Sequence, residues 1–231
     1  MNVITQENMC KVTEDVLDVV ARFAITNQKK QMNPILVIVP DRATLGCEKI
    51  LMRNMNALLN VRVVTFSMLF HLCNVDEISV LDKTTAVLMM WRACGDVSKD
   101  LIYFSKSVHQ YSFSEKMFNT INQLESSRAD FLTLEKNAKS EITKRKMRDI
   151  STIHARYKEL CKGYIDSAGM LGWLLDNVSR CTLIKNAHVY VTGFEYLSIQ
   201  REEVLRKIAS VARSFTIGAQ RGSEFENFTR V

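Results

Sequence analysis

The sequence predicts an α/β protein in which a P-loop-like parallel sheet is interrupted by an all-helical subdomain. Short runs rich in β-branched apolar residues, ILVIV at 35–39 and VRVVTF at 61–66, alternate with helical stretches, which is typical of βαβ units. From about residue 81 the hydrophobic pattern changes: apolar residues recur every three or four positions, and no convincing strand pattern is present. We therefore expect residues 1–80 and 181–231 to form the α/β core and residues 81–180 to form the helical insertion.

Each expected element rests on its own pattern. Residues 35–39 lie between Pro34 and Pro40, which is typical of a short strand buried on both faces. Ser67 is expected to cap a short helix after residues 61–66. The expected strands are 1–5, 35–39, 61–66, 188–192 and 214–217, and the expected core helices are 12–23, 43–59 and 200–213. Because no stop signal follows residue 221, we expect the chain to continue in a longer protein.

Composition excludes several classes of protein. The chain has 231 residues, 47% hydrophobic and 24% charged, so it is too apolar for a disordered chain. No apolar run approaches the length of a membrane span, and the polar N-terminus is not a signal peptide, so we expect a cytoplasmic protein without membrane contact. The six cysteines form no CxxC pair, and the four histidines are scattered, so no metal site is expected.

The positions that bind nucleotide in P-loop proteins lack the required residues. A phosphate loop needs glycines, a lysine and a hydroxyl, whereas the stretch QENMCKV at 6–12 has no glycine. Lys11 stands at the lysine position, and Val12 stands at the hydroxyl position. The strand at 188–192 ends in Thr192, where a magnesium-holding carboxylate is needed. The sequence therefore predicts a P-loop-like fold with no catalytic, cofactor-binding or metal-binding residue.

Four blocks, in order, resemble the N-terminal part of the B subunit of bacterial ATP-dependent helicase–nucleases, the AddB/RexB family. The blocks are ILVIVPDRAT at 35–44, VVTFSMLF at 63–70, DISTIHARYKELCKGYID at 149–166 and HVYVTGFEYLSIQ at 188–200. The chain departs from the family pattern at several positions: Arg42 replaces Gln, Met68 replaces Arg, Thr192 replaces Asp and Ile199 replaces Pro. The missing glycine loop resembles RexB-type members more than AddB-type ones.

The resemblance implies a superfamily 1 helicase domain whose ATPase site has decayed. Family members pair with an active helicase–nuclease A subunit, as a heterodimer, to resect double-strand breaks for recombinational repair. Their iron–sulfur cluster and magnesium belong to a nuclease domain far downstream, so no cofactor is expected in this chain. The resemblance also implies contact with single-stranded or unwinding DNA.

We expect DNA contacts at the carboxyl ends of the strands and on a basic helix. In an open α/β sheet the ligand binds beside the strands' carboxyl ends. Arg and Thr can hold phosphates there, and aromatic rings can stack on unpaired bases. The rim candidates are Asp41, Arg42, Thr44, Ser67, His71, Phe194 and Tyr196. The basic helix, within residues 139–162, contributes Lys144, Arg145 and Lys146.

Each of these features has a plainer explanation. Thr44 and Ser67 are also ordinary helix caps, Phe194 is equally a core residue, and the basic stretch is also a solvated helix face. The apolar run at 87–94, with Met89, Met90 and Trp91, indicates subdomain core or a subunit interface. Two other functions stay open: a scaffold that docks the partner subunit without touching DNA, and an ATP hydrolase with an unorthodox phosphate loop.

Overall fold

The computed structural model describes residues 1–27, 33–55, 60–74, 78–223, 226 and 228. The chain forms two compact units. Unit 1 comprises Met1–Val75, Trp173–Leu197 and Arg201–Val231, and unit 2 comprises Asp76–Gly172 and Ser198–Gln200.

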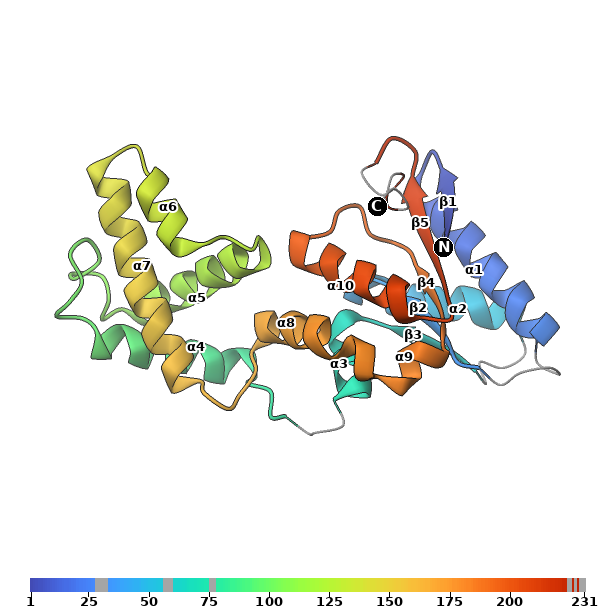
Figure 1. The fold of residues 1–231 in the computed structure, drawn as a ribbon, viewed down its shortest axis with the longest axis horizontal. Helices are drawn as coiled ribbons and strands as arrows, with labels where there is room; N and C mark the ends of the chain where they lie inside the picture. The colour runs from blue at the N-terminus through green and yellow to red at the C-terminus, as the bar shows by residue number, and fades with distance from the viewer. Residues whose placement is uncertain (28–32, 56–59, 75–77, 224–225, 227, 229–231) are drawn as a thin grey trace. The chain divides into compact units, whose positions relative to one another are not determined.

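A five-stranded parallel sheet forms the centre of unit 1 (Figure 1). The strands lie in the order β1-β5-β4-β2-β3, so the N-terminal strand pairs with the last one. Their bounds are β1 Asn2–Gln6, β2 Ile35–Ile38, β3 Val61–Val64, β4 His188–Val191 and β5 Ser214–Gln220. All four residues of β2 are buried, as expected for a β-branched run in the middle of a parallel sheet. The predicted parallel α/β sheet is confirmed.

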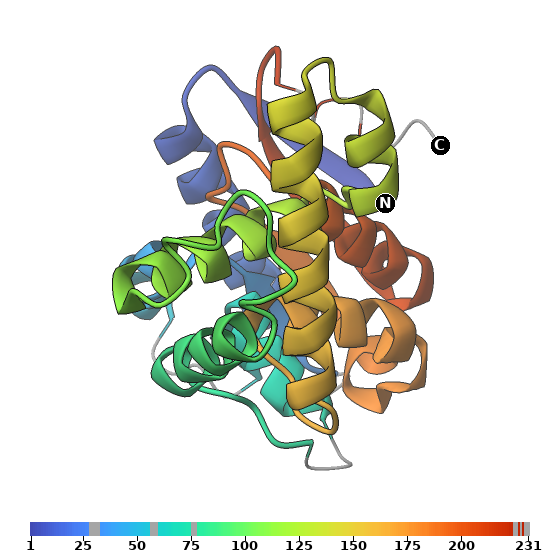
Figure 2. The ribbon, with the colours of Figure 1, turned by 90° about the vertical axis from the view of Figure 1, so that its left-hand side faces the viewer.

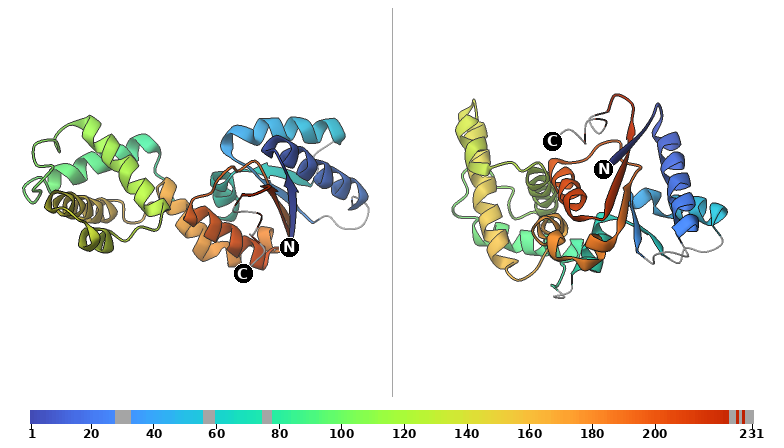
Figure 3. Two further views of the ribbon diagram at one scale, coloured as in Figure 1. Left: turned by 90° about the horizontal axis from the view of Figure 1, so that it is seen from above. Right: turned by 45° about the vertical axis from the view of Figure 1, so that its right-hand side comes forward.

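Helices cover both faces of this sheet (Figure 3). On one face, Val12, Val16 and Val20 of α1 pack with Leu51 of α2 on the inward residues of β2 and β3. α10 lies on the other face (Figure 3). The helical elements of this part are α1 Met9–Asn27, η1 Asp41–Ala43, α2 Thr44–Asn54, α3 Phe66–Cys73, η2 Val178–Arg180, α9 Thr182–Asn186 and α10 Ile199–Val211.

Unit 2 is built from helices around its own core. α7 is the long gold helix of Figure 2, and α4, α5 and α6 all contact it. Met90, Ile121, Ile153 and Tyr157 are fully buried where α4, α5 and α7 meet. The helices are α4 Lys83–Asp96, α5 Tyr111–Ser126, α6 Phe131–Asn137, α7 Glu141–Leu160 and the first part of α8 Ser167–Asn177. Among the described residues of this unit, strand-like pairing is limited to a bridge between Val80 and Ile165.

Some local expectations are wrong. The helix expected over 43–59 ends at Asn54, and residues 56–59 lie outside the described residues. The strand expected over 61–66 ends at Val64, and Thr65 then caps α3 by accepting the N–H of Met68. Ser67 is therefore a residue within α3 and not its cap, because the chain has already turned into the helix at Phe66.

Residues 87–94 lie in α4, and only one side of this stretch is buried in the core of unit 2. Met90 is fully buried and Met89 is half-buried, but Trp91 is 46% exposed, so Trp91 is not part of the core. Within the described part of the chain, no helix combines the length and apolar character needed to span a membrane.

Candidate nucleic-acid interface

The loop at the phosphate-loop position is too short to cradle a phosphate. β1 ends at Gln6 and α1 begins at Met9, so Glu7 and Asn8 form the whole connection. A Walker A motif instead wraps several glycine-rich backbone N–H groups around the phosphates. The Asn8 side chain accepts the N–H of Cys10, which occupies one of the free donors at the start of the helix.

Side chains of α1 and Thr192 pack closely around β5. Thr192, at the end of β4, is fully buried and donates a hydrogen bond of 3.1 Å to the hydroxyl of Thr13 on α1. Val12 is also fully buried beside β5. A Cβ added to Gly218 of β5 would lie 2.6 Å from Val12 Cγ1 and 3.1 Å from Thr192 Oγ1. The start of α1 is thus joined to the end of β4 by a hydroxyl pair, and Val12 packs tightly on β5.

The loops after β2 and β4 meet at the carboxyl rim of the sheet. Gly193 adopts φ +83°, and a Cβ there would lie 3.1 Å from Pro40 Cδ. Arg42, in η1, pairs with Glu195 at 3.4 Å. Both side chains are more than half exposed, so this ion pair contributes little stability and can be exchanged for a phosphate. Asp41 is exposed beside Arg42 and offsets its charge.

The other polar candidates have mixed surroundings. Thr44 is half-buried and donates its hydroxyl to the backbone carbonyl of Asp41, so its hydrogen bond stabilises the turn into α2. Ser67 and His71 are exposed on α3. His71 borders a cavity of about 470 Å³ that is also lined by Arg62 and Met68.

The aromatic candidates differ sharply in exposure. Tyr196 is 80% exposed, so its ring is free to stack on a base. Phe194 is 7% exposed and packs on Phe66, with ring centroids 5.8 Å apart, so its burial favours the core explanation. Arg201 lies over the same Phe66 ring at 5.7 Å and brings a second cation to this segment. Arg201 is not among the candidates that the sequence pattern indicates, although it directly follows the Gln200 that ends the fourth block.

The basic helix α7 has two different halves. In its C-terminal half, Arg156 pairs with Asp96 and Glu159 at 2.7 and 2.6 Å, and Lys158 pairs with Glu125 at 2.7 Å. In its N-terminal half, Lys144, Arg145 and Arg148 are exposed and form no ion pair with any described residue. Their spacing of three and four residues places these cations on one face of the helix.

Lys146 lies on a different side of α7 from this face. Its ammonium group is over the Tyr103 ring, 4.6 Å from the centroid. The rim candidates are in unit 1 and the basic helix is in unit 2, so the structure places the two groups in different units. Among the described residues, no three His, Cys, Asp or Glu side chains come together in a group that could hold a metal.

Comparison with known proteins identifies the family. Residues 17–227 match the family described as ADDB, N-terminal. The chain is 26% identical over 202 residues to the B subunit of the ATP-dependent helicase/deoxyribonuclease of Alkaliphilus metalliredigens, covering 82% of this chain and 18% of that protein. It is 24% identical over 216 residues to the protein of the same name from Clostridioides difficile, covering 87% and 18%.

A third relative, from Listeria welshimeri, also carries the name of the B subunit of an ATP-dependent helicase/deoxyribonuclease. It is 28% identical over 200 residues, covering 82% of this chain and 17% of that protein. The chain thus spans less than a fifth of the length of these curated relatives. Since the family match covers most of the residues, the chain belongs to the AddB N-terminal family.

Proposed function

We propose that this chain is the non-catalytic, helicase-like N-terminal module of a helicase–nuclease B subunit that acts in double-strand break resection and repair. It contacts single-stranded DNA and the partner A subunit in a heterodimer, and it binds no cofactor of its own. The family match and the relatives' names support this proposal, because a name that denotes a B subunit implies an assembly with at least one other subunit.

The observation that carries the non-catalytic part is the contact between Thr192 and Thr13. β5 lies between β1 and β4, so the positions for a phosphate loop and for a magnesium-binding carboxylate flank one strand. This arrangement supports descent from a P-loop domain. A carboxylate at the end of β4 would hold magnesium in such a domain, whereas the buried Thr192 offers only a hydroxyl.

The unpaired face of α7 supports DNA contact. Lys144 and Arg148 are four residues apart, a spacing at which like charges destabilise a helix by about 0.2–0.5 kcal/mol. The cations also begin close to the N-terminus of α7, where the helix dipole disfavours positive charge. A bound polyanion would remove both penalties. The paired C-terminal half of the same helix shows how a purely structural basic face is arranged.

A salt titration of single-stranded DNA binding tests this proposal. If about three phosphates are neutralised, the slope of log K against log salt is expected to be about −2 for a fluorescent oligothymidylate followed by anisotropy. Changing Arg42→Ala should reduce the slope by about 0.7, and changing Lys144→Ala together with Arg145→Ala by about 1.4. Arg53→Ala, an exposed cation in the last turn of α2, is the matched control and should leave the slope unchanged.

The alternative functions correspond to other outcomes. Absence of DNA binding at about 50 mM salt would contradict DNA contact and favour a scaffold that docks only the A subunit. The same conclusion would follow if neither Arg42→Ala nor the Lys144→Ala, Arg145→Ala double variant altered the salt slope. Magnesium-dependent ATP hydrolysis by the chain would favour an unorthodox hydrolase.

A further inference from the structure

The strand-end rim of unit 1 already holds an anion, and that anion belongs to the chain itself. Glu195, in the loop after β4, places its Oε1 atom 3.4 Å from the Nη2 atom of Arg42, in η1 after β2. The two residues are 153 positions apart in the sequence, and both belong to unit 1. A carboxylate bound to this arginine shows that the rim accepts a negatively charged oxygen here, which is also what a DNA phosphate presents.

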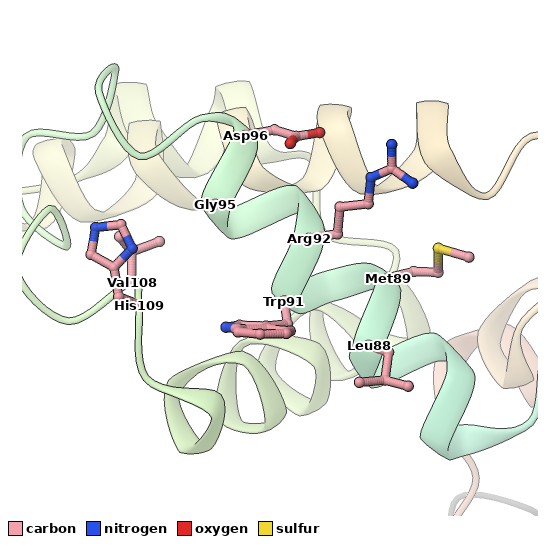
Figure 4. Close-up of a pocket in the computed structure, with 8 residues that line it drawn as sticks. All are labelled: Leu88, Met89, Trp91, Arg92, Gly95, Asp96, Val108 and His109. Carbon is pink, nitrogen blue, oxygen red and sulfur yellow. The ribbon is translucent and has the colours of Figure 1, made fainter.

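The geometry of this ion pair differs from that of a pair that stabilises unit 2. Asp96, at the end of α4 (Figure 4), accepts two hydrogen bonds from Arg156, of 2.9 and 2.7 Å, and the two side chains are only 36% and 31% exposed. Arg42 and Glu195 make one contact, which is longer than a strong charge-assisted hydrogen bond, and their side chains are 75% and 54% exposed. The pair therefore stabilises the fold little, and a phosphate can replace the carboxylate.

The backbone brings Glu195 to Arg42 without help from the ion pair. Gly193 adopts φ +83°, and a Cβ there would lie 3.1 Å from Pro40 Cδ, so the loops after β4 and β2 approach closely at this point. Asp41 is the direct neighbour of Arg42 in the sequence, yet the guanidinium pairs with Glu195. The fold, and not the local sequence, thus selects the carboxylate that occupies Arg42.

We propose that Glu195 is a built-in competitor of DNA, whose carboxylate occupies the place of a phosphate on Arg42 when no strand is bound. When single-stranded DNA binds, a phosphate displaces the carboxylate, and the free energy needed to break the ion pair lowers the affinity of the rim. This assignment rests on the proposed function, because it takes the rim to contact DNA. It goes beyond that function by identifying the residue that limits how tightly Arg42 holds the strand.

The size of the effect follows from the exposure of the pair. Breaking an exposed ion pair before binding weakens an association by about 1.5-fold to fivefold. Glu195→Gln removes the charge and keeps the length of the side chain, so it should strengthen the binding of single-stranded DNA by that factor at low salt. The gain should shrink as the salt concentration rises, because salt screens exposed ion pairs.

A double-variant cycle separates the release of Arg42 from a general loss of negative charge. The Kd of a fluorescent oligothymidylate is measured by anisotropy at about 50 mM salt for the wild type, Glu195→Gln, Arg42→Ala and the double variant. In the Arg42→Ala background the gain from Glu195→Gln should nearly disappear, because no guanidinium is left to release. Glu14→Gln makes the same change in net charge at an exposed position of α1 that forms no ion pair with any described residue, and it should leave the Kd almost unchanged. All the substituted side chains are exposed, so each variant should unfold at the temperature of the wild type.

The outcomes distinguish this assignment from the proposed function. If Glu195→Gln binds oligothymidylate no more tightly than the wild type, or if its gain survives undiminished in the Arg42→Ala background, Glu195 is not a competitor for Arg42 and the proposed DNA contact stands. A gain no larger than that of Glu14→Gln leads to the same conclusion. If neither the wild type nor Glu195→Gln binds the strand, the competitor role and the DNA-contacting function both fail.

Discussion

Gly218 provides a quantitative test of how tightly α1 packs on β5. A Cβ at this residue would lie 2.6 Å from Val12 Cγ1 and 2.9 Å from Val16 Cγ2, and both valines are fully buried. Neither distance is compatible with carbon atoms in van der Waals contact. Gly218→Ala is therefore expected to lower the free energy of unfolding by about 1–3 kcal/mol, the usual cost of an overpacked core.

Two further variants separate this steric effect from a general effect of alanine. Gly46 lies in α2 with open space around its Cβ position, so Gly46→Ala should stabilise the protein by about 0.5–1 kcal/mol. Val12→Ala alone should cost about 1–3 kcal/mol through lost burial. Combined with Gly218→Ala, it removes the nearer of the two clashing atoms and leaves Val16 Cγ2, so the double variant should be more stable than the sum of the single effects by about 1 kcal/mol.

Thermal unfolding followed by Trp173 fluorescence in a Trp91→Phe background provides the measurement, because Trp173 belongs to unit 1 and is then the one tryptophan of the chain. For a chain of this size, 1–3 kcal/mol corresponds to a decrease in Tm of roughly 2–12 °C. A Gly218→Ala variant as stable as the wild type would show that α1 is not packed against β5 in this way. Additive effects of Gly218→Ala and Val12→Ala would contradict the proposed clash with Val12.

Two predictions concern the core of unit 2. Buried Asp149 accepts the backbone N–H groups of residues 102–104, so Asp149→Asn should lower the free energy of unfolding in urea by about 1.5–3 kcal/mol, while exposed Asp176→Asn should not. Burial raises the pKa of Glu125, but hydrogen bonds from His154 and Lys158 outweigh burial and hold this pKa below the usual 4.5. The charged Glu125 carboxylate therefore stabilises the folded protein above its ordinary pKa. This stabilisation is lost as the pH falls through the lower pKa of Glu125 in the folded protein. Glu125→Gln has no such carboxylate, so it should lose less stability than the wild type between about pH 5 and 3. If the free energy of unfolding of that variant falls between pH 5 and 3 as steeply as that of the wild type, the proposed role of Glu125, His154 and Lys158 is wrong.

The strands were predictable because the sheet is parallel and covered on both faces. Under that condition a strand is a short β-branched apolar run, as at residues 35–39, and no competing pattern has the same length and flanking residues. Element ends were less predictable. Thr65 and Ser67 both carry hydroxyls that can cap α3. The capping residue is the one whose backbone stays extended before the helix begins. That residue is Thr65, with φ −99° and ψ 172°.

The sequence could not assign a direction to every apolar side chain. Residues 87–91 are all apolar, so helical periodicity does not reveal which face of α4 turns away from the core. Trp91 was therefore expected in the subdomain core or at a subunit interface; it is 46% exposed, so the core alternative is wrong. The pairs Arg42–Glu195 and Thr13–Thr192 were also beyond prediction, because 153 and 179 residues separate their members and only the folded sheet brings them together.

Titration of the chain with ATP and magnesium in a calorimeter tests most directly the central claim, that a helicase-like core here lacks a nucleotide site. Because the loop between β1 and α1 has two residues and no glycine, and the buried Thr192 offers no carboxylate, we predict no saturable heat up to millimolar ATP, with or without magnesium. Saturable binding with a Kd in the low micromolar range that requires magnesium, and that is lost on Lys11→Ala, would contradict the account.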